Sequence, residues 1–145
     1  WLRVQRTLLP TPSRFHYVFN LRELSRAFQG IMETPLSVLT DEAHLVSLWK
    51  HECARVFADK LARQQDKHFV ERLIAELALE HLGSADSARS CGATGWWCDF
   101  QRDRRESSEE EDGAQAPKVY EPVESWPDVT RRAYEYLRIF NERHP

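Results

Sequence analysis

The sequence predicts an all-α fold, in which a group of packed helices is followed by a flexible connector and one further helix. Three observations support this prediction. Apolar residues recur every three or four positions in several segments, capping residues stand before those segments, and glycine or proline marks where several of them stop. A length of 145 residues suits about one domain with a modest core.

The first clear helix is predicted to begin at Leu21. Asn20 is a good N-cap, and Glu23 stands where a capping box requires an acidic side chain. Gly30 is expected to end this helix in a left-handed cap. Before the helix, two prolines within residues 10–12 forbid a helix and favour an extended turn. The predicted apolar stripe consists of Leu21, Leu24, Phe28 and Ile31.

Two longer helices follow and are expected to pack antiparallel. The first is predicted to start at Thr40, with two acidic residues in its first turn. Asp66 is expected to cap the second, whose apolar stripe runs to Leu82 before Gly83 ends it. The apolar positions of the first of these helices are Leu45, Leu48, Trp49, Cys53, Val56, Phe57 and Leu61.

In the second half of the chain, an aromatic patch and a charged stretch replace the helical patterns. Residues 96–100 form an isolated aromatic patch, which is expected to fill a groove. Residues 101–118 carry three arginines and an acidic run but no apolar side chain larger than alanine, so they predict a disordered linker. Residues 119–123 are typical of an extended segment, and Ser125 is expected to cap a last helix. Its apolar face would be Val129, Ala133, Leu137 and Phe140.

Composition excludes several classes of protein. The formal charge of -3 and a pI of about 6.1 offer no basic surface for nucleic acid. No apolar run approaches the roughly 18 residues that span a bilayer, and no signal peptide opens the chain, which favours a soluble intracellular protein without a membrane partner. Cys53, Cys91 and Cys98 are too few and too irregularly spaced for a disulfide framework, so reduced thiols are expected. The first residue, Trp1, favours a fragment.

The sequence contains no complete catalytic or metal-binding motif. His51 and Glu52 begin an HExxH pattern, but Arg55 stands where the second histidine is required. These residues and Asp59 are expected to line the polar side of the long helix, with Glu52 and Arg55 paired. Cys91, Cys98 and His81 lack a fourth metal ligand, and only nearby Arg89 would favour a cysteine nucleophile. No residue is therefore assigned a catalytic role, and no metal site is expected.

Arg22 is the strongest candidate for a binding residue. The chain contains no glycine-rich phosphate loop, so it is not expected to hold a nucleotide or hydrolyse ATP alone. Arg22 nevertheless lies at the second position of a capped helix, where free N–H groups already favour anions. It can reach a phosphate from there, or it can be an exposed arginine that pairs with Glu23. Local residues leave both interpretations open.

Three segments resemble dynein heavy chains. The stretch LPTPSRFHYVFNLRELSR at residues 9–26, followed by FQG at residues 28–30, closely resembles the opening of the third AAA+ lid. Residues 48–59 resemble the next lid helix, and residues 117–125 resemble the entry to the fourth module. Cys53 and the Ser-Glu-Glu linker are most similar to axonemal outer-arm heavy chains of the gamma type.

The resemblance implies a division into three parts. Residues 1–95 would be the helical lid of the third AAA+ module, residues 96–118 an aromatic patch and acidic linker, and residues 119–145 the start of the fourth module. Arg22 matches the sensor arginine that an AAA+ lid directs at nucleotide phosphates. Tyr120 and Val123 would approach the adenine of the next module. ATP or ADP with Mg²⁺ would be held mainly by parts of the parent chain that this sequence lacks.

The implied function is to sense and transmit ATP state within the AAA+ ring of a ciliary or flagellar motor. The parent would be an ATP-hydrolysing microtubule motor of the cytoplasm, cytoskeleton and axoneme. Its partners would be neighbouring AAA+ modules, the dynein complex and, through distant parts, the microtubule. The alternative is a free-standing helical adaptor without nucleotide binding, which would contact a partner through a surface of Trp49, Trp96 and Trp97.

Overall fold

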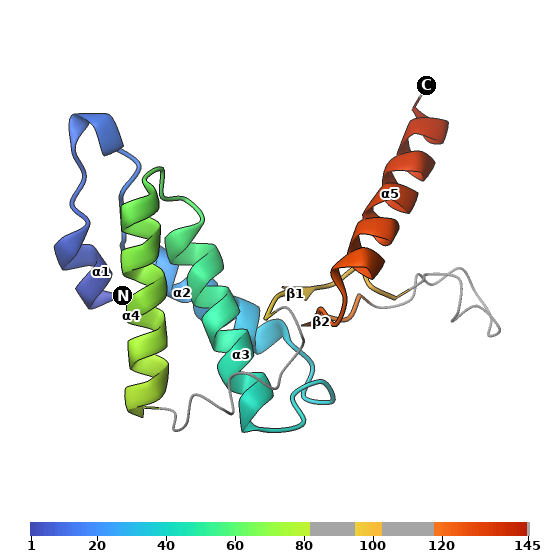
Figure 1. Ribbon diagram of the computed structural model, residues 1–145, viewed down its shortest axis with the longest axis horizontal. Helices are drawn as coiled ribbons and strands as arrows, with labels where there is room; N and C mark the ends of the chain where they lie inside the picture. Colours follow the sequence, from blue (N-terminus) through green and yellow to red (C-terminus); the bar gives the residue numbers. More distant parts are fainter. Residues whose placement is uncertain (82–94, 103–117, 145) are drawn as a thin grey trace.

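The computed structural model describes residues 1–81, 95–102 and 118–144 (Figure 1). Most of the predicted acidic linker, Cys91 and the expected stop at Gly83 lie outside these residues. The described residues form helices and one small sheet, which confirms the predicted all-α class. The elements are α1 (Leu2–Thr7), the 3-10 helix η1 (Pro12–Arg14), α2 (Leu21–Glu33), α3 (Glu42–Cys53), the π-helix η2 (Ala54–Ala58), α4 (Gln64–His81), β1 (Trp97–Cys98), β2 (Glu121–Pro122) and α5 (Trp126–Arg143).

Helix α2 begins as its capping residues predict and ends later than expected. The Asn20 side chain accepts a hydrogen bond from the backbone N–H of Arg22 at 2.8 Å, and Glu23 accepts from that of Asn20 at 2.9 Å. The expectation that Gly30 caps the C-terminus is wrong, because the helix continues to Glu33. Its end is Thr34, whose hydroxyl donates to the Gly30 carbonyl at 3.0 Å. Gly30 therefore serves another purpose inside the helix.

The predicted apolar stripe of α2 is also wrong in part. Leu21 and Phe28 are 65% and 57% exposed, and Ala27 is the residue of this helix that is buried. The contacts of α2 are with α3 and η2, so the small side chain of Ala27 faces those elements. Periodicity located the helix, whereas packing decided which of its faces is covered.

The two long helices pack antiparallel, as predicted. Figure 1 shows α3 rising to the turn that leads into α4, which then runs back along it. Their starts differ from the predicted ones. Asp41 rather than Thr40 caps α3, and its carboxylate accepts a hydrogen bond from the N–H of His44 at 2.9 Å. Helix α4 begins at Gln64, so Asp66 lies in its first turn, where its carboxylate binds other side chains.

The buried side chains form two clusters. The larger joins α1, the segment before α2, η2 and α4, although α1 has no counterpart among the predicted helices. The smaller is built from Ala43, Leu48 and Trp97. It attaches the connector, defined here as the described residues 95–102 and 118–125, to α3, because Trp97 lies on β1, which pairs antiparallel with β2. Helix α5 extends from this connector away from the other helices and contains no buried residue (Figure 1).

None of the described helices is long and apolar enough to cross a membrane.

Candidate functional site

Arg22 lies at the exposed N-terminus of α2, the place at which the sequence predicts an anion-binding arginine. Its backbone N–H is used by the Asn20 cap, but its side chain is exposed to solvent. Within residues 1–81, 95–102 and 118–144, no carboxylate forms an ion pair with its guanidinium. The arrangement leaves a cation beside the positive end of a helix of 13 residues, which can bind a negatively charged group.

Glu23, the alternative partner for Arg22, is engaged elsewhere. Its carboxylate accepts the Asn20 N–H and lies 3.6 Å from the ammonium of Lys60, which comes from the turn after η2. Burial raises the pKa of Glu23, but the backbone hydrogen bonds and the Lys60 charge outweigh it and hold that pKa below its ordinary value. Glu23 is thus a charged structural group, and the interpretation in which it neutralises Arg22 is not supported.

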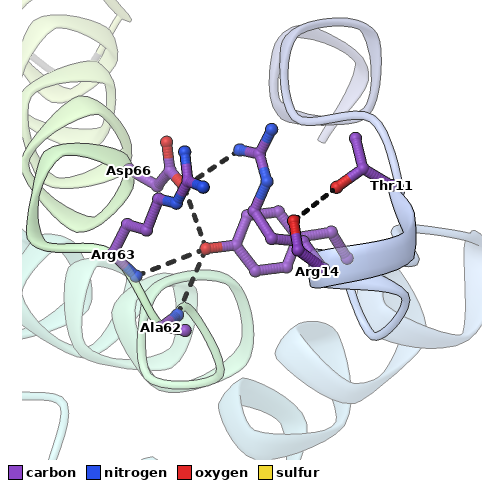
Figure 2. A network of polar contacts seen from close by, with 7 residues as sticks. Thr11, Arg14, Ala62, Arg63 and Asp66 are labelled. Carbon is purple, nitrogen blue, oxygen red and sulfur yellow. Dashed lines mark hydrogen bonds and ion pairs between the residues drawn. The ribbon is translucent and has the colours of Figure 1, made fainter.

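A network of polar contacts fixes the segment that precedes α2 (Figure 2). The hydroxyl of Tyr17, a residue only 1% exposed, donates to the Asp66 carboxylate at 2.9 Å. The same hydroxyl oxygen accepts from the backbone N–H groups of Ala62 and Arg63 at 3.2 and 3.4 Å. Arg14 adds an ion pair of 3.3 Å to Asp66. The start of α4 therefore holds the chain that leads into the Asn20 cap and positions the N-terminus of α2.

A second polar cluster surrounds the Glu52 carboxylate, which is 1% exposed. Arg55 donates to its Oε2 from Nε at 3.1 Å and also from Nη2, which confirms the predicted pair. Tyr120 donates its hydroxyl to the other oxygen, Oε1, at 2.7 Å. The prediction that His51, Glu52, Arg55 and Asp59 line the polar side of this helix is wrong in part, because His51 and Glu52 are buried, whereas Arg55 and Asp59 are exposed. The connector covers them, and helical periodicity carries no information about a segment so distant in sequence.

The titratable groups of this cluster are perturbed by their surroundings. Burial, followed by the hydrogen bond to Glu52 and the negative charge of that residue, raises the pKa of Tyr120 far above its ordinary value, so the hydroxyl remains a donor. Burial lowers the pKa of His51 below its ordinary 6.5, although the charge of Glu52 acts in the opposite direction. The His51 ring lies 5.7 Å from that of Trp96 and 6.1 Å from that of Tyr120.

Tyr120 and Val123, the two residues predicted to approach adenine, lie on the connector. The Tyr120 hydroxyl binds Glu52, and the Val123 side chain is 1% exposed. The Val123 N–H donates to the carbonyl of Trp96 at 2.7 Å. Tyr120 is therefore bound to α3 through Glu52, and Val123 to the segment of Trp96. Their contact with adenine stays a prediction.

The tryptophans do not form the surface that an adaptor would require. Trp97 is 3% exposed and donates its indole N–H to the hydroxyl of Ser47 at 3.2 Å, so this residue of the aromatic patch is buried against α3. Trp49 is partly buried against the larger core cluster, whereas Trp96 is largely exposed. A surface common to the three rings is thus missing, because two of them pack into different cores.

The described cysteines are free thiols, one buried and the other partly buried. Burial raises the pKa of Cys53 to about 11 and also raises that of Cys98, so neither has the lowered pKa of a reactive nucleophile. In the part of the chain that the structure describes, no three His, Cys, Asp or Glu side chains come together as metal ligands.

The packing of the helices agrees with what the comparisons with known proteins show. The family model described as the AAA+ lid domain matches residues 2–84. This match covers more than half of the chain, and the chain therefore belongs to the AAA+ lid domain family.

The relatives define a narrower group. The chain is 38% identical to dynein axonemal heavy chain 5 of Rattus norvegicus and 37% identical to dynein axonemal heavy chain 8 of Homo sapiens, over 98% of its own length in both cases. The dynein gamma chain of the flagellar outer arm of Chlamydomonas reinhardtii is 36% identical over 71% of this chain. The chain spans 3–4% of the length of these relatives. The resemblance to dynein heavy chains is confirmed, and the chain corresponds to a segment of an axonemal one.

Proposed function

We propose that this chain is the helical lid of the third AAA+ module of a ciliary or flagellar dynein motor, together with the start of the fourth module. In this role it senses the ATP state of its module and transmits that state to the neighbouring ones. The family match and the axonemal, flagellar and ciliary relatives support a dynein motor segment located in the axoneme and cytoskeleton. The module number rests on the resemblance of residues 9–30 and 117–125.

The observation that carries the proposal is the free guanidinium of Arg22 at a capped helix N-terminus. The Asn20 and Glu23 side chains fix that terminus, and Lys60 occupies the carboxylate that would otherwise compete for Arg22. A charge-assisted contact between a guanidinium and a phosphate is stronger than a neutral hydrogen bond. A nucleotide that makes this contact in one lid orientation only would bias the lid toward that orientation.

ATP or ADP with Mg²⁺ would be held mainly by other parts of the parent chain. From this chain we assign Arg22 alone, as a donor to a phosphate oxygen, and no residue as a ligand of the metal. The donor set fits a phosphate, since a guanidinium and a helix N-terminus both favour negative charge. Neighbouring AAA+ modules, the dynein complex and the microtubule, reached through distant parts of the parent, are the partners that this role requires.

The test is Arg22→Ala in the motor that contains this chain, with Arg26→Ala as the control. Arg26 is an exposed arginine of the same helix, and neither substitution touches the capping box. Loss of a hydrogen bond between charged groups costs roughly 1.5–3 kcal/mol, so nucleotide affinity at the third module should fall about ten- to a hundredfold. Binding is measured with a fluorescent nucleotide while the first module is kept intact. Equal affinities for the two variants would show that Arg22 is not the sensor.

A further inference from the structure

The Glu52 cluster joins two helices of the lid to the connector that leads to α5. Glu52 belongs to α3, Gly30 to α2, and Tyr120 to the connector that leads to β2 and α5. The bond between Tyr120 and Glu52 spans 68 positions of sequence. A buried carboxylate is stable only when its oxygens have partners, and here each oxygen accepts from a different element.

Gly30 leaves the space that the Glu52 carboxylate occupies. A Cβ built on Gly30 would lie 2.1 Å from Oε2 and 2.8 Å from Oε1 of Glu52. Such contacts are far below van der Waals separation, so even an alanine would force the carboxylate to move. The absence of a side chain at Gly30 thus has a specific reason, which is the close approach of α2 to a charged group.

The connector contacts this carboxylate through Tyr120, in addition to its attachment through Trp97. Tyr120 packs beside His51 and Trp97, with ring centroids about 6.1 Å apart in both cases, and ends in its hydrogen bond to Glu52. Next to Tyr120, β2 pairs with β1, and the Val123 N–H donates to the Trp96 carbonyl. A shift of Glu52 therefore changes the position of the Tyr120 hydroxyl first and the two strands with it.

We propose that Glu52 is a positioning residue that couples α2, the helix that carries Arg22, to the connector and hence to α5. Its carboxylate packs against Gly30 on one side and holds Tyr120 on the other, so a displacement of α2 is passed to the connector. The functional role of this coupling rests on the proposed function, because Glu52 and Tyr120 would be residues through which the lid transmits nucleotide state. The contact itself requires no nucleotide.

The experiment is a double-mutant cycle read by amide hydrogen exchange. The wild-type heavy chain that contains this segment, Gly30→Ala, Tyr120→Phe and the double variant are compared by mass spectrometry without nucleotide. The reporter is the peptide that contains the Val123 amide. Loss of a hydrogen bond to a charged group corresponds to about a tenfold change in an opening equilibrium, so each single variant should exchange about tenfold faster there. The double variant should exchange no faster than the faster single variant.

Two controls separate this coupling from general destabilisation. Ser25 is exposed on α2, so Ser25→Ala should leave the exchange rate of the Val123 amide unchanged. Amides around Val70 in the core of α4 should keep their protection in every variant. The proposal is overturned if Gly30→Ala does not accelerate exchange at Val123, if the two effects multiply, or if the α4 amides accelerate by the same factor. Arg22→Ala should not alter exchange, so failure of the sensor assignment would leave this result intact.

Discussion

Replacing Tyr17 by phenylalanine removes one oxygen from the network that holds the segment before α2. The Tyr17 ring would remain in the core, where it lies 6.4 Å from the ring of Phe19. What is lost is the donor to Asp66 at 2.9 Å and the acceptor for two backbone N–H groups at 3.2 and 3.4 Å. Since apolar burial is nearly unchanged, the change in stability reports the hydroxyl alone.

The expected magnitude follows from these contacts. A hydrogen bond to a charged group contributes about 1.5–3 kcal/mol, and a buried donor left without a partner costs about 1–3 kcal/mol. The two backbone N–H groups are partly buried and their hydrogen bonds are long, so the loss of their acceptor should cost an amount near the lower end of about 1–3 kcal/mol. We expect Tyr17→Phe to lower the free energy of unfolding by about 2–4 kcal/mol. Asp66→Asn retains an acceptor and should cost less.

The assay is urea denaturation of the chain, followed by tryptophan fluorescence, with Tyr134→Phe as the matched control. Tyr134 lies on α5 and is largely exposed, so removal of its hydroxyl should change stability by less than about 0.5 kcal/mol. A loss for Tyr17→Phe as small as that of the control would refute the argument. The hydrogen bonds of Tyr17 in Figure 2 would then contribute nothing measurable to the free energy of unfolding.

Gly30→Ala should accelerate exchange of the Val123 amide about tenfold, because it displaces the Glu52 carboxylate that accepts the hydrogen bond from Tyr120. In a Glu52→Ala background the same change should not accelerate exchange there, and acceleration in both backgrounds would contradict the proposed collision. Burial lowers the pKa of His51, so the folded state binds fewer protons than the unfolded state below pH 6.5, and stability should fall as pH decreases from about 7 to 5. His51→Gln should flatten this slope more than the exposed control His68→Gln, and equal slopes would exclude His51 as the cause.

The sequence was sufficient to predict those features of the structure that depend on residues close together along the chain. The capping box at Asn20 and Glu23 involves residues three positions apart, and the structure contains both of its hydrogen bonds. The antiparallel helices follow from periodicity, and the Glu52–Arg55 pair follows from i,i+3 spacing. The contiguous stretch at residues 9–26 carries the resemblance to dynein heavy chains. In each case the deciding interaction is local or the pattern is contiguous.

The sequence was insufficient wherever the deciding neighbour lies on another element. A glycine near the end of a helical pattern predicts a C-cap, but Gly30 lies inside α2, where the Glu52 carboxylate of α3 leaves no space for a side chain. Helical spacing assigns His51 and Glu52 to the polar side of the helix, whereas in the structure the connector covers both residues.

The sequence by itself therefore determined the class of fold, the family and the position of Arg22 at a capped helix start. Only the tertiary structure decided that Glu23 pairs with Lys60 and that Tyr120 binds Glu52. The physical reason is that a hydrogen bond or an ion pair requires atoms within a few ångströms. Helical geometry guarantees that proximity for residues three or four positions apart. For residues 68 positions apart it arises only when the elements have packed.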